Sequence, residues 1–456
     1  MGPLRRLLRS QLRINIASGF ATTGLSAALA LLSYPVFLHF LGLEQYGVWL
    51  ILATVLSVAQ LGNFGLAPAV SKLIAEDHGR GDTAGVYRYI TAATLTLLVM
   101  GSVAFAILLA FRAPLVAALA LSPANARTVY TLFPWIGPLS LYVVTVDTLA
   151  VTLAGLGRID LANYAQTGAQ FVAFVIATVL LNVGYGIPSL MIGSALSYFL
   201  LHIATITLIR FTAGPRPSAA PLFAFDRARV SRLLHFGSWV FAGSIANLLL
   251  NPFNRAMLTR YVGVSSVTIF DIASNSSMKI RSLVETGLRA LAPEVSRNPE
   301  RLASVSRQTS RLIAIAAVPA YAAIFFLAPH LLRIWLGSRF VPELTLAFRI
   351  LLVGSFASLW GASSYHLLMG LGKARQVLIC FAIQSGVSAG IILVAPVTLR
   401  TVVLATACGM VASTIYLRHQ LARASSDAIR RSRDIPAVGK QPSQETPDAG
   451  PGSLPD

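Results

Sequence analysis

Charge and cysteine are both scarce in this sequence. Charged residues make up only 12% of its 456 residues and the mean hydropathy is +0.70, which lies outside the range of soluble globular domains. The two cysteines, Cys380 and Cys408, lie in apolar runs, which indicates neither a disulfide nor a metal site. The sequence contains no Walker pattern, no His/Cys metal-ligand spacing and no nucleophile constellation. We therefore expect no enzymatic activity, no cofactor and no metal.

Acidic residues are also few, with 17 Asp and Glu against 36 Lys and Arg, so the net charge is +19. In a soluble protein this balance would indicate a nucleic-acid partner. Here the basic residues gather in alternate loops between apolar runs, so a membrane distribution explains the charge and no nucleic acid is expected. The bias predicts an even number of spanning helices in the cell (inner) membrane, with both termini in the cytoplasm. The basic residues on the poorer side are Arg112, Arg127, Arg260, Arg333, Arg339 and Arg400.

Long apolar runs fill most of the chain, whose length suits about 12 spanning helices of roughly 20 residues each. We predict an all-α membrane protein with two pseudo-symmetric six-helix lobes. The predicted helices cover 14–40, 45–75, 86–111, 128–154, 161–181, 189–210, 233–259, 265–292, 310–328, 343–369, 375–395 and 397–418.

A basic, proline-containing stretch, 211–232, is the only central break in the hydropathy. It predicts an N-terminal lobe over 1–210, a cytoplasmic linker over 211–232 and a C-terminal lobe over 233–421. Residues 422–456 are polar and rich in Pro, Ser, Gly and Asp, which predicts a disordered cytoplasmic tail.

The two predicted lobes resemble each other at two turns. GLGR (155–158) follows the fourth predicted helix, and GLGK (370–373) follows the tenth. More weakly, Gly42 after the first helix aligns with Gly263 after the seventh. A single such turn is most often a helix C-cap. Its recurrence at equivalent places predicts two parallel repeats with a cargo site between them.

One predicted spanning helix, 265–292, is unusually polar. At about 100° per residue, Asp271, Asn275 and Glu285 share a face, and Lys279 and Arg281 flank it. Ionised side chains that face lipid cost several kcal/mol each, so this face must contact protein or a water-filled cavity. A cationic face inside a membrane domain indicates an anionic cargo.

Several stretches resemble a known family. They are RINIASGF from Arg13, FLGLEQYGVWLILATV from Phe40, SKLIAE from Ser71, LLRIWLGSRFVPELTLAFRILLVG from Leu331 and the two GLG turns. Over about residues 10–420 the chain resembles the polysaccharide-biosynthesis flippases of the multidrug/oligosaccharidyl-lipid/polysaccharide exporter superfamily, which include the O-antigen lipid-carrier translocases. The resemblance implies two V-shaped six-helix lobes, alternating access, and transfer of a polyprenyl-diphosphate-linked oligosaccharide from the inner to the outer leaflet. It also implies polysaccharide polymerase and glycosyltransferases as partners in surface polysaccharide (exopolysaccharide) assembly.

A lipid-linked glycan would need fixed cations along its path, because a bare diphosphate would cost tens of kcal/mol to move through an apolar slab. The predicted substrate-binding residues are Arg255, Lys279, Arg281, Asn247, Asn251 and Asn275. The three basic groups would bind the diphosphate, since an arginine fork bonds two oxygens at once, and the asparagines would face sugar hydroxyls. In the competing interpretation Arg255 pairs with Asp271 across two helices, and Arg281 pairs with Glu285 one turn away.

Asp147 is the only clear acid in the middle of a predicted helix of the first lobe. Together with Asp271 and Glu285, it is predicted to couple transport to an ion or to balance the cavity cations. Alternatively, Asp147 is a hydrogen-bonded acid beside Tyr142 or Thr148.

Two other functions compete with lipid-linked glycan transfer. A cation-coupled exporter of small drugs, from the same superfamily, should have acids lining the first lobe, and the first predicted helix has none. A non-transporting scaffold for glycan-assembly enzymes would need no charged cavity. The net positive charge predicted near the middle of the second lobe favours the anionic cargo.

Overall fold

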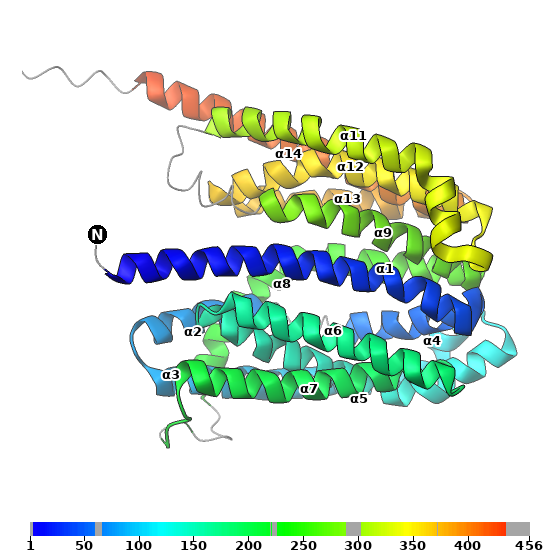
Figure 1. Ribbon diagram of the computed structural model, residues 1–456, viewed down its shortest axis with the longest axis horizontal. Coiled ribbons are helices and arrows are strands. Elements are labelled where there is room, and N and C mark those ends of the chain that lie inside the picture. Colours follow the sequence, from blue (N-terminus) through cyan, green and yellow to red (C-terminus); the bar gives the residue numbers. More distant parts are fainter. Residues whose placement is uncertain are drawn as a thin grey trace, which may run out of the picture.

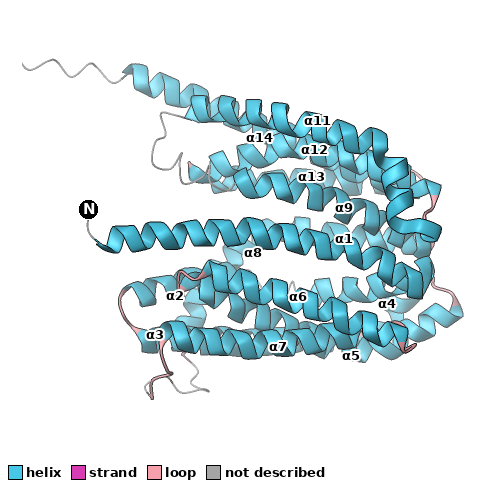
Figure 2. Ribbon diagram, in the orientation of Figure 1, coloured by secondary structure: helices cyan, strands magenta, loops and turns pink. Residues whose placement is uncertain are grey.

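The computed structural model describes residues 3–59, 66–218, 220, 226–288, 302–371 and 373–434, and these residues form helices and short loops without strands (Figure 2). The helices, in chain order, are α1 (Pro3–Ala59), α2 (Leu66–Gly79), α3 (Thr83–Ala110), α4 (Arg112–Ala118), α5 (Pro123–Gly155), α6 (Ile159–Asn182), α7 (Pro188–Ala213), α8 (Arg227–Tyr261), α9 (Val264–Leu288), α11 (Leu302–Leu336), the 3₁₀ helix η3 (Gly337–Arg339), α12 (Pro342–Gly370), α13 (Ala374–Val394) and α14 (Leu399–Asp434).

Eight helices in the described ranges are long and apolar enough to cross a membrane. The first candidate, Ala17–Thr54, holds two helices, because Gly42 has a φ of 68° and interrupts the helical backbone there. The helices α8 and α9 are long but carry polar and charged residues, and the apolar part of α13, Leu378–Val394, is shorter. The predicted all-α membrane class is confirmed.

The helices form two groups on either side of α1 (Figure 1). In the first group α5 packs on α2, α3 and α7, while α6 packs on α7; in the second group α12 packs on α9, α11 and α14, while α13 packs on α14. The helix α1 contacts α6 on one side and α9 on the other. The start of α1 and the end of α14 lie at one end of the bundle, which we call the terminal end; the opposite end is the distal end.

Among the described residues, buried apolar side chains join the two groups only at the distal end. The largest core cluster contains Leu38 and Leu52 of α1 together with Leu258, Phe270 and Leu351 of the second group. At the terminal end the described core residues divide into one cluster around α2, α3 and α5 and a separate cluster around α11, α12 and α14. The two lobes therefore share a core at one end and separate toward the other.

The backbone repeats at the two GLG turns. Arg158 N donates to Leu153 O at 2.8 Å, and Lys373 N donates to Leu368 O at 2.9 Å. Arg158 and Lys373 also share a backbone conformation as the N-cap residues of α6 and α13, with φ/ψ of −105°/58° and −84°/52°. The same backbone geometry recurs in both lobes, which supports the predicted internal repeat.

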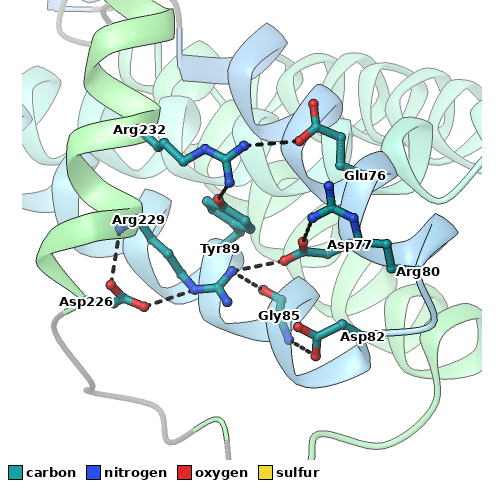
Figure 3. A network of polar contacts seen from close by, with 9 residues as sticks. All are labelled: Glu76, Asp77, Arg80, Asp82, Gly85, Tyr89, Asp226, Arg229 and Arg232. Carbon is teal, nitrogen blue, oxygen red and sulfur yellow. Dashed lines mark hydrogen bonds and ion pairs between the residues drawn. The ribbon is translucent and has the colours of Figure 1, made fainter.

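The helix α8 starts on the first lobe and ends in the second. Its N-cap residue, Asp226, accepts a hydrogen bond from Arg229 N at 3.1 Å. The Arg229 guanidinium donates to Asp226 at 2.9 Å and to Asp77 of α2 at 3.0 Å, and it lies over the ring of Tyr89 of α3 at 4.6 Å (Figure 3). Arg232 donates to Tyr89 Oη and to Glu76. This network attaches the first turns of α8 to α2 and α3.

Several predicted boundaries differ from the observed ones. The stretch between the helices predicted at 86–111 and 128–154 contains α4, and the tail predicted from 422 remains helical to Asp434. The helices α1 and α11 begin well before the predicted positions 14 and 310. Hydropathy predicts the part of a helix that lies in the membrane. A helix can continue beyond that part wherever its backbone hydrogen bonds are satisfied, so these helices are longer than the predicted ones. Residues 60–65, inside the helix predicted over 45–75, lie outside the described residues.

Candidate functional site

A cavity of about 610 Å³, which we call the central cavity, lies inside the first lobe and faces α9 of the second. Its walls come from α1, α5, α6 and α7, and Lys279 is the lining residue from α9. The polar lining residues are Ser26, Ser33, Asp147, Gln166, Gln170, Ser194, Ser197, Tyr198 and Lys279. The aromatic rings of Phe37, Trp49 and Phe174 also line the cavity. The volume and the mixture of apolar surface with a few polar groups are typical of a ligand site.

Two of the charged residues predicted from the sequence line this cavity, Lys279 and Asp147. Tyr198 Oη donates to Asp147 Oδ2 at 3.4 Å. The expected neighbour Tyr142 instead hydrogen bonds with His202 at 3.1 Å. Asp147 is therefore a hydrogen-bonded acid, but its partner lies on α7 and is neither Tyr142 nor Thr148 of α5.

Arg255 does not line this cavity, because its guanidinium connects the two lobes at the distal end. It donates to Asp271 of α9, and across the lobes to Leu50 O at 3.2 Å and Thr54 Oγ1 at 3.1 Å. Asp271 is 3% exposed, and a carboxylate buried to this extent needs a compensating charge. Arg255 supplies that charge through the ion pair. This is the pairing that the competing interpretation predicts.

Tyr34 of α1 completes the same distal network. Its hydroxyl donates to Asp271 Oδ2 at 3.0 Å and accepts from Asn275 Nδ2 at 3.0 Å. Asn275 therefore contacts α1 rather than the cavity in this conformation. We call Tyr34, Thr54, Arg255, Asp271 and Asn275 the distal cluster.

Arg281 lies on another side of α9, within the second lobe. It pairs with Glu285 at 3.1 Å and donates to Ser358 of α12 at 3.2 Å. His366 Nε2 lies 4.0 Å from the other oxygen of Glu285. Asp271 and Glu285 are thus each paired with an arginine of their own lobe, which fits the charge-balancing alternative.

The predicted asparagines divide in the same way. Asn251 is exposed and lies outside the cavity lining. Its neighbour Asn254 is fully buried and donates to Thr406 of α14 at 3.2 Å, a packing role. The side chain of Asn247 lies outside the described residues. Among the predicted substrate-binding residues whose side chains are described, the structure places only Lys279 at the cavity.

The amide and hydroxyl groups on α6 and α7 were not identified from the sequence. Gln166 and Gln170 are four residues apart, and Ser194, Ser197 and Tyr198 follow the same helical spacing, so each set shares one face of its helix. These two short polar stripes in otherwise apolar helices are the signal that could have located the cavity.

The fold resembles solved transporter structures. An inward-facing multidrug resistance MATE family transporter of the MOP superfamily matches with a TM-score of 0.71 and 16% identity, over 92% of this chain and 99% of that one. An outward-facing MATE family transporter of that superfamily matches with a TM-score of 0.59 and 15% identity, over 90% and 96%. A MOP superfamily transporter from Pyrococcus furiosus, described as having a binding pocket of reverse polarity, gives 0.62 and 16%, over 91% and 96%.

The two-lobed helical fold is the one found in these MOP superfamily transporters, and its long apolar helices are those of a multi-pass membrane protein, which confirms the predicted architecture. Residues 36–344 match the model of a family described as "Polysaccharide biosynthesis protein". The chain belongs to this polysaccharide biosynthesis family. No curated protein matches it.

Proposed function

We propose that this transporter moves a polyprenyl-diphosphate-linked oligosaccharide from the inner to the outer leaflet by alternating access. The observation that carries the proposal is the cavity of about 610 Å³, in which amides, hydroxyls and aromatic rings of the first lobe face a single lysine of the second. Membership of a polysaccharide biosynthesis family supports a glycan as the cargo.

The cavity wall formed by the first lobe is suited to bind the sugar part of the cargo. Gln166 and Gln170 offer both donors and acceptors to sugar hydroxyls, and Asp147 and the serine hydroxyls add further hydrogen-bonding groups. The aromatic rings present apolar surface to the CH faces of sugar rings. Because these polar groups already lie in a cavity, they can exchange hydrogen bonds with water for hydrogen bonds with a ligand.

Lys279 is suited to bind the diphosphate. This lysine is the one described cation in the cavity lining, and it reaches the cavity from the lobe opposite the amides. Binding of the diphosphate by Arg255 and Arg281 remains a prediction that requires their present partners, Asp271 and Glu285, to be exchanged for phosphate oxygens. We therefore assign the first contact with the diphosphate to Lys279.

The conformation described here corresponds to an inward-facing state. Three observations support this: the lobes share a core only at the distal end, the distal cluster crosses between them, and the fold matches an inward-facing transporter with a higher TM-score than an outward-facing one. The protein would then lie in the inner membrane, with its basic terminal end in the cytoplasm. Polysaccharide polymerase and glycosyltransferases are the proposed partners.

Cation-coupled export of small molecules is the second candidate, and Asp147 favours it. This acid lines the first-lobe cavity, where a cation-coupled exporter needs one. In either function Asp147 is the proposed coupling residue. Asp147→Asn should then make transport independent of the ion gradient while the protein still folds.

Lys279→Gln tests the proposed function in cells. At matched protein level in the membrane, the variant should lose surface polysaccharide at least about tenfold, because it removes the cavity's cation. Lys279→Arg should retain part of the activity. Lys373→Gln, at the turn before α13, is the matched control and should be normal. Normal polysaccharide in Lys279→Gln would contradict the assignment.

A further inference from the structure

A second cavity lies in the first lobe, at the terminal end, and no part of the proposed transport path uses it. It has a volume of about 320 Å³ and lies between α3, α5 and α7. No described residue lines both this cavity and the central one. The three helices that form it are all candidate membrane spans, so the cavity lies among helices that would cross the membrane.

The two ends of this cavity differ in chemistry. Arg210 and Arg216 lie at the terminal end, whereas Leu98 and Ile206 belong to its apolar walls. From Tyr87 to Leu98 the lining extends along α3 for about 16 Å, at 1.5 Å per residue. None of the described lining residues is acidic, in contrast to the central cavity with Asp147. The cavity therefore combines a cationic end with a long apolar wall.

The cationic end is held in place by the protein. Arg216 donates to Thr91 Oγ1 and lies 5.5 Å from the centre of the Tyr87 ring. The Tyr87 hydroxyl in turn donates to Gly214 O at 2.6 Å, which fixes the ring. Arg210 in the last turn of α7 is exposed, and none of the ion pairs found in the described part of the chain includes it.

We propose that this cavity binds an anionic phospholipid of the leaflet at the terminal end, with its phosphate at Arg210 and Arg216 and one acyl chain along α3 and α7. Basic pockets between spanning helices recognise anionic lipid head groups through this combination of charges and apolar walls. The positive charge selects an anionic over a zwitterionic head group, and the apolar wall selects a lipid over a soluble phosphate. The site is separate from the cargo cavity, so the proposal does not depend on the identity of the cargo.

A titration of purified, delipidated protein with phosphatidylglycerol tests this site, with native mass spectrometry and the thermal midpoint as readouts. Phosphatidylglycerol should bind and raise the midpoint, and phosphatidylcholine should do so far less. Arg210→Gln should raise the apparent Kd for phosphatidylglycerol about fivefold, as expected for one basic group near an anionic head group. Arg127→Gln, an exposed arginine of the same lobe at the distal end, is the matched control and should leave the Kd unchanged.

Two further arms keep the test decisive. Ile206→Trp should weaken phosphatidylglycerol binding by filling the chain-binding wall while both arginines remain. The water-soluble head group glycerophosphoglycerol should not compete at lipid concentrations that saturate the site. Equal binding of both phospholipids, an unchanged Kd in Arg210→Gln, or full competition by the soluble head group would overturn the proposal.

Discussion

At the scale of single residues, the positive charges of the second lobe have separate roles. Arg255 and Arg281 each pair with an acid of their own lobe, while Lys279 reaches the cavity. A buried ion pair contributes little net stability, because desolvation offsets most of the attraction. Removing one partner is costly, since the other charge remains buried without compensation.

This asymmetry predicts the stability of Arg255 variants. Arg255→Met leaves Asp271, whose side chain is 4% exposed, without its cation, and should lower the free energy of unfolding by roughly 3–5 kcal/mol. Arg255→Met with Asp271→Asn should regain most of that loss, because no charge remains buried. Thermal unfolding in detergent measures both. If the double variant were as unstable as the sum of the two single variants, the pair would not be coupled.

At the scale of elements, α8 connects the two lobes. Its first turns are attached to α2 and α3 by Arg229, and its last turns contact α9 through Arg255 and Asp271. Motion of one lobe relative to the other must therefore deform α8 or break one of these attachments. The network in Figure 3 is the attachment to the first lobe.

Arg229→Gln should weaken this attachment. It removes the charged hydrogen bonds to Asp77 and Asp226, so we expect a loss of roughly 2 kcal/mol and faster amide hydrogen exchange in the first turns of α8. Arg80→Gln is the control. Arg80 lies 3.9 Å from Asp77 with a side chain 68% exposed, so its loss should cost less than about 1 kcal/mol. Equal exchange in both variants would argue against the attachment.

The approach of α1 to α9 gives a second prediction at this scale. A Cβ on Gly47 would lie 2.5 Å from the backbone oxygen of Val264, so Gly47→Val should hold the lobes apart at the distal end. Spin labels at Gln45 and Val262, in a background with both cysteines replaced by serine, should show a longer distance than in the protein with Gly47. An unchanged distance distribution would mean that the contact tolerates a side chain.

Local sequence patterns predicted the helices and turns better than they predicted which side chains contact one another. Gly42 and Gly263 were placed at the turns after the first and seventh predicted helices, and in the structure both have a positive φ, 68° and 118°, which glycine adopts without a steric penalty. Helical spacing placed Lys279 and Arg281 on either side of one stripe, but it could not show which of them meets the cavity. That choice depends on how α9 packs against α1 and α12, which is set by the tertiary structure.

At the scale of the whole molecule, the lobes share a core at the distal end and have separate cores at the terminal end. Alternating access would require the reverse arrangement as well, in which the distal cluster separates and the terminal ends meet. The polar composition of the distal cluster fits such a reversible contact, because its members can exchange their partners for water when it opens. A wholly apolar contact would expose its surface to water at greater cost.

The most direct test of the central claim is transport by the purified protein in liposomes. A fluorescent polyprenyl-diphosphate oligosaccharide placed in one leaflet should reach the other, and Lys279→Gln should reduce its rate at least about tenfold, whereas Lys373→Gln should not. A cationic dye in the same liposomes should not be moved. Ion-driven transport of the dye with no transfer of the glycan lipid would contradict the account and favour a small-molecule exporter.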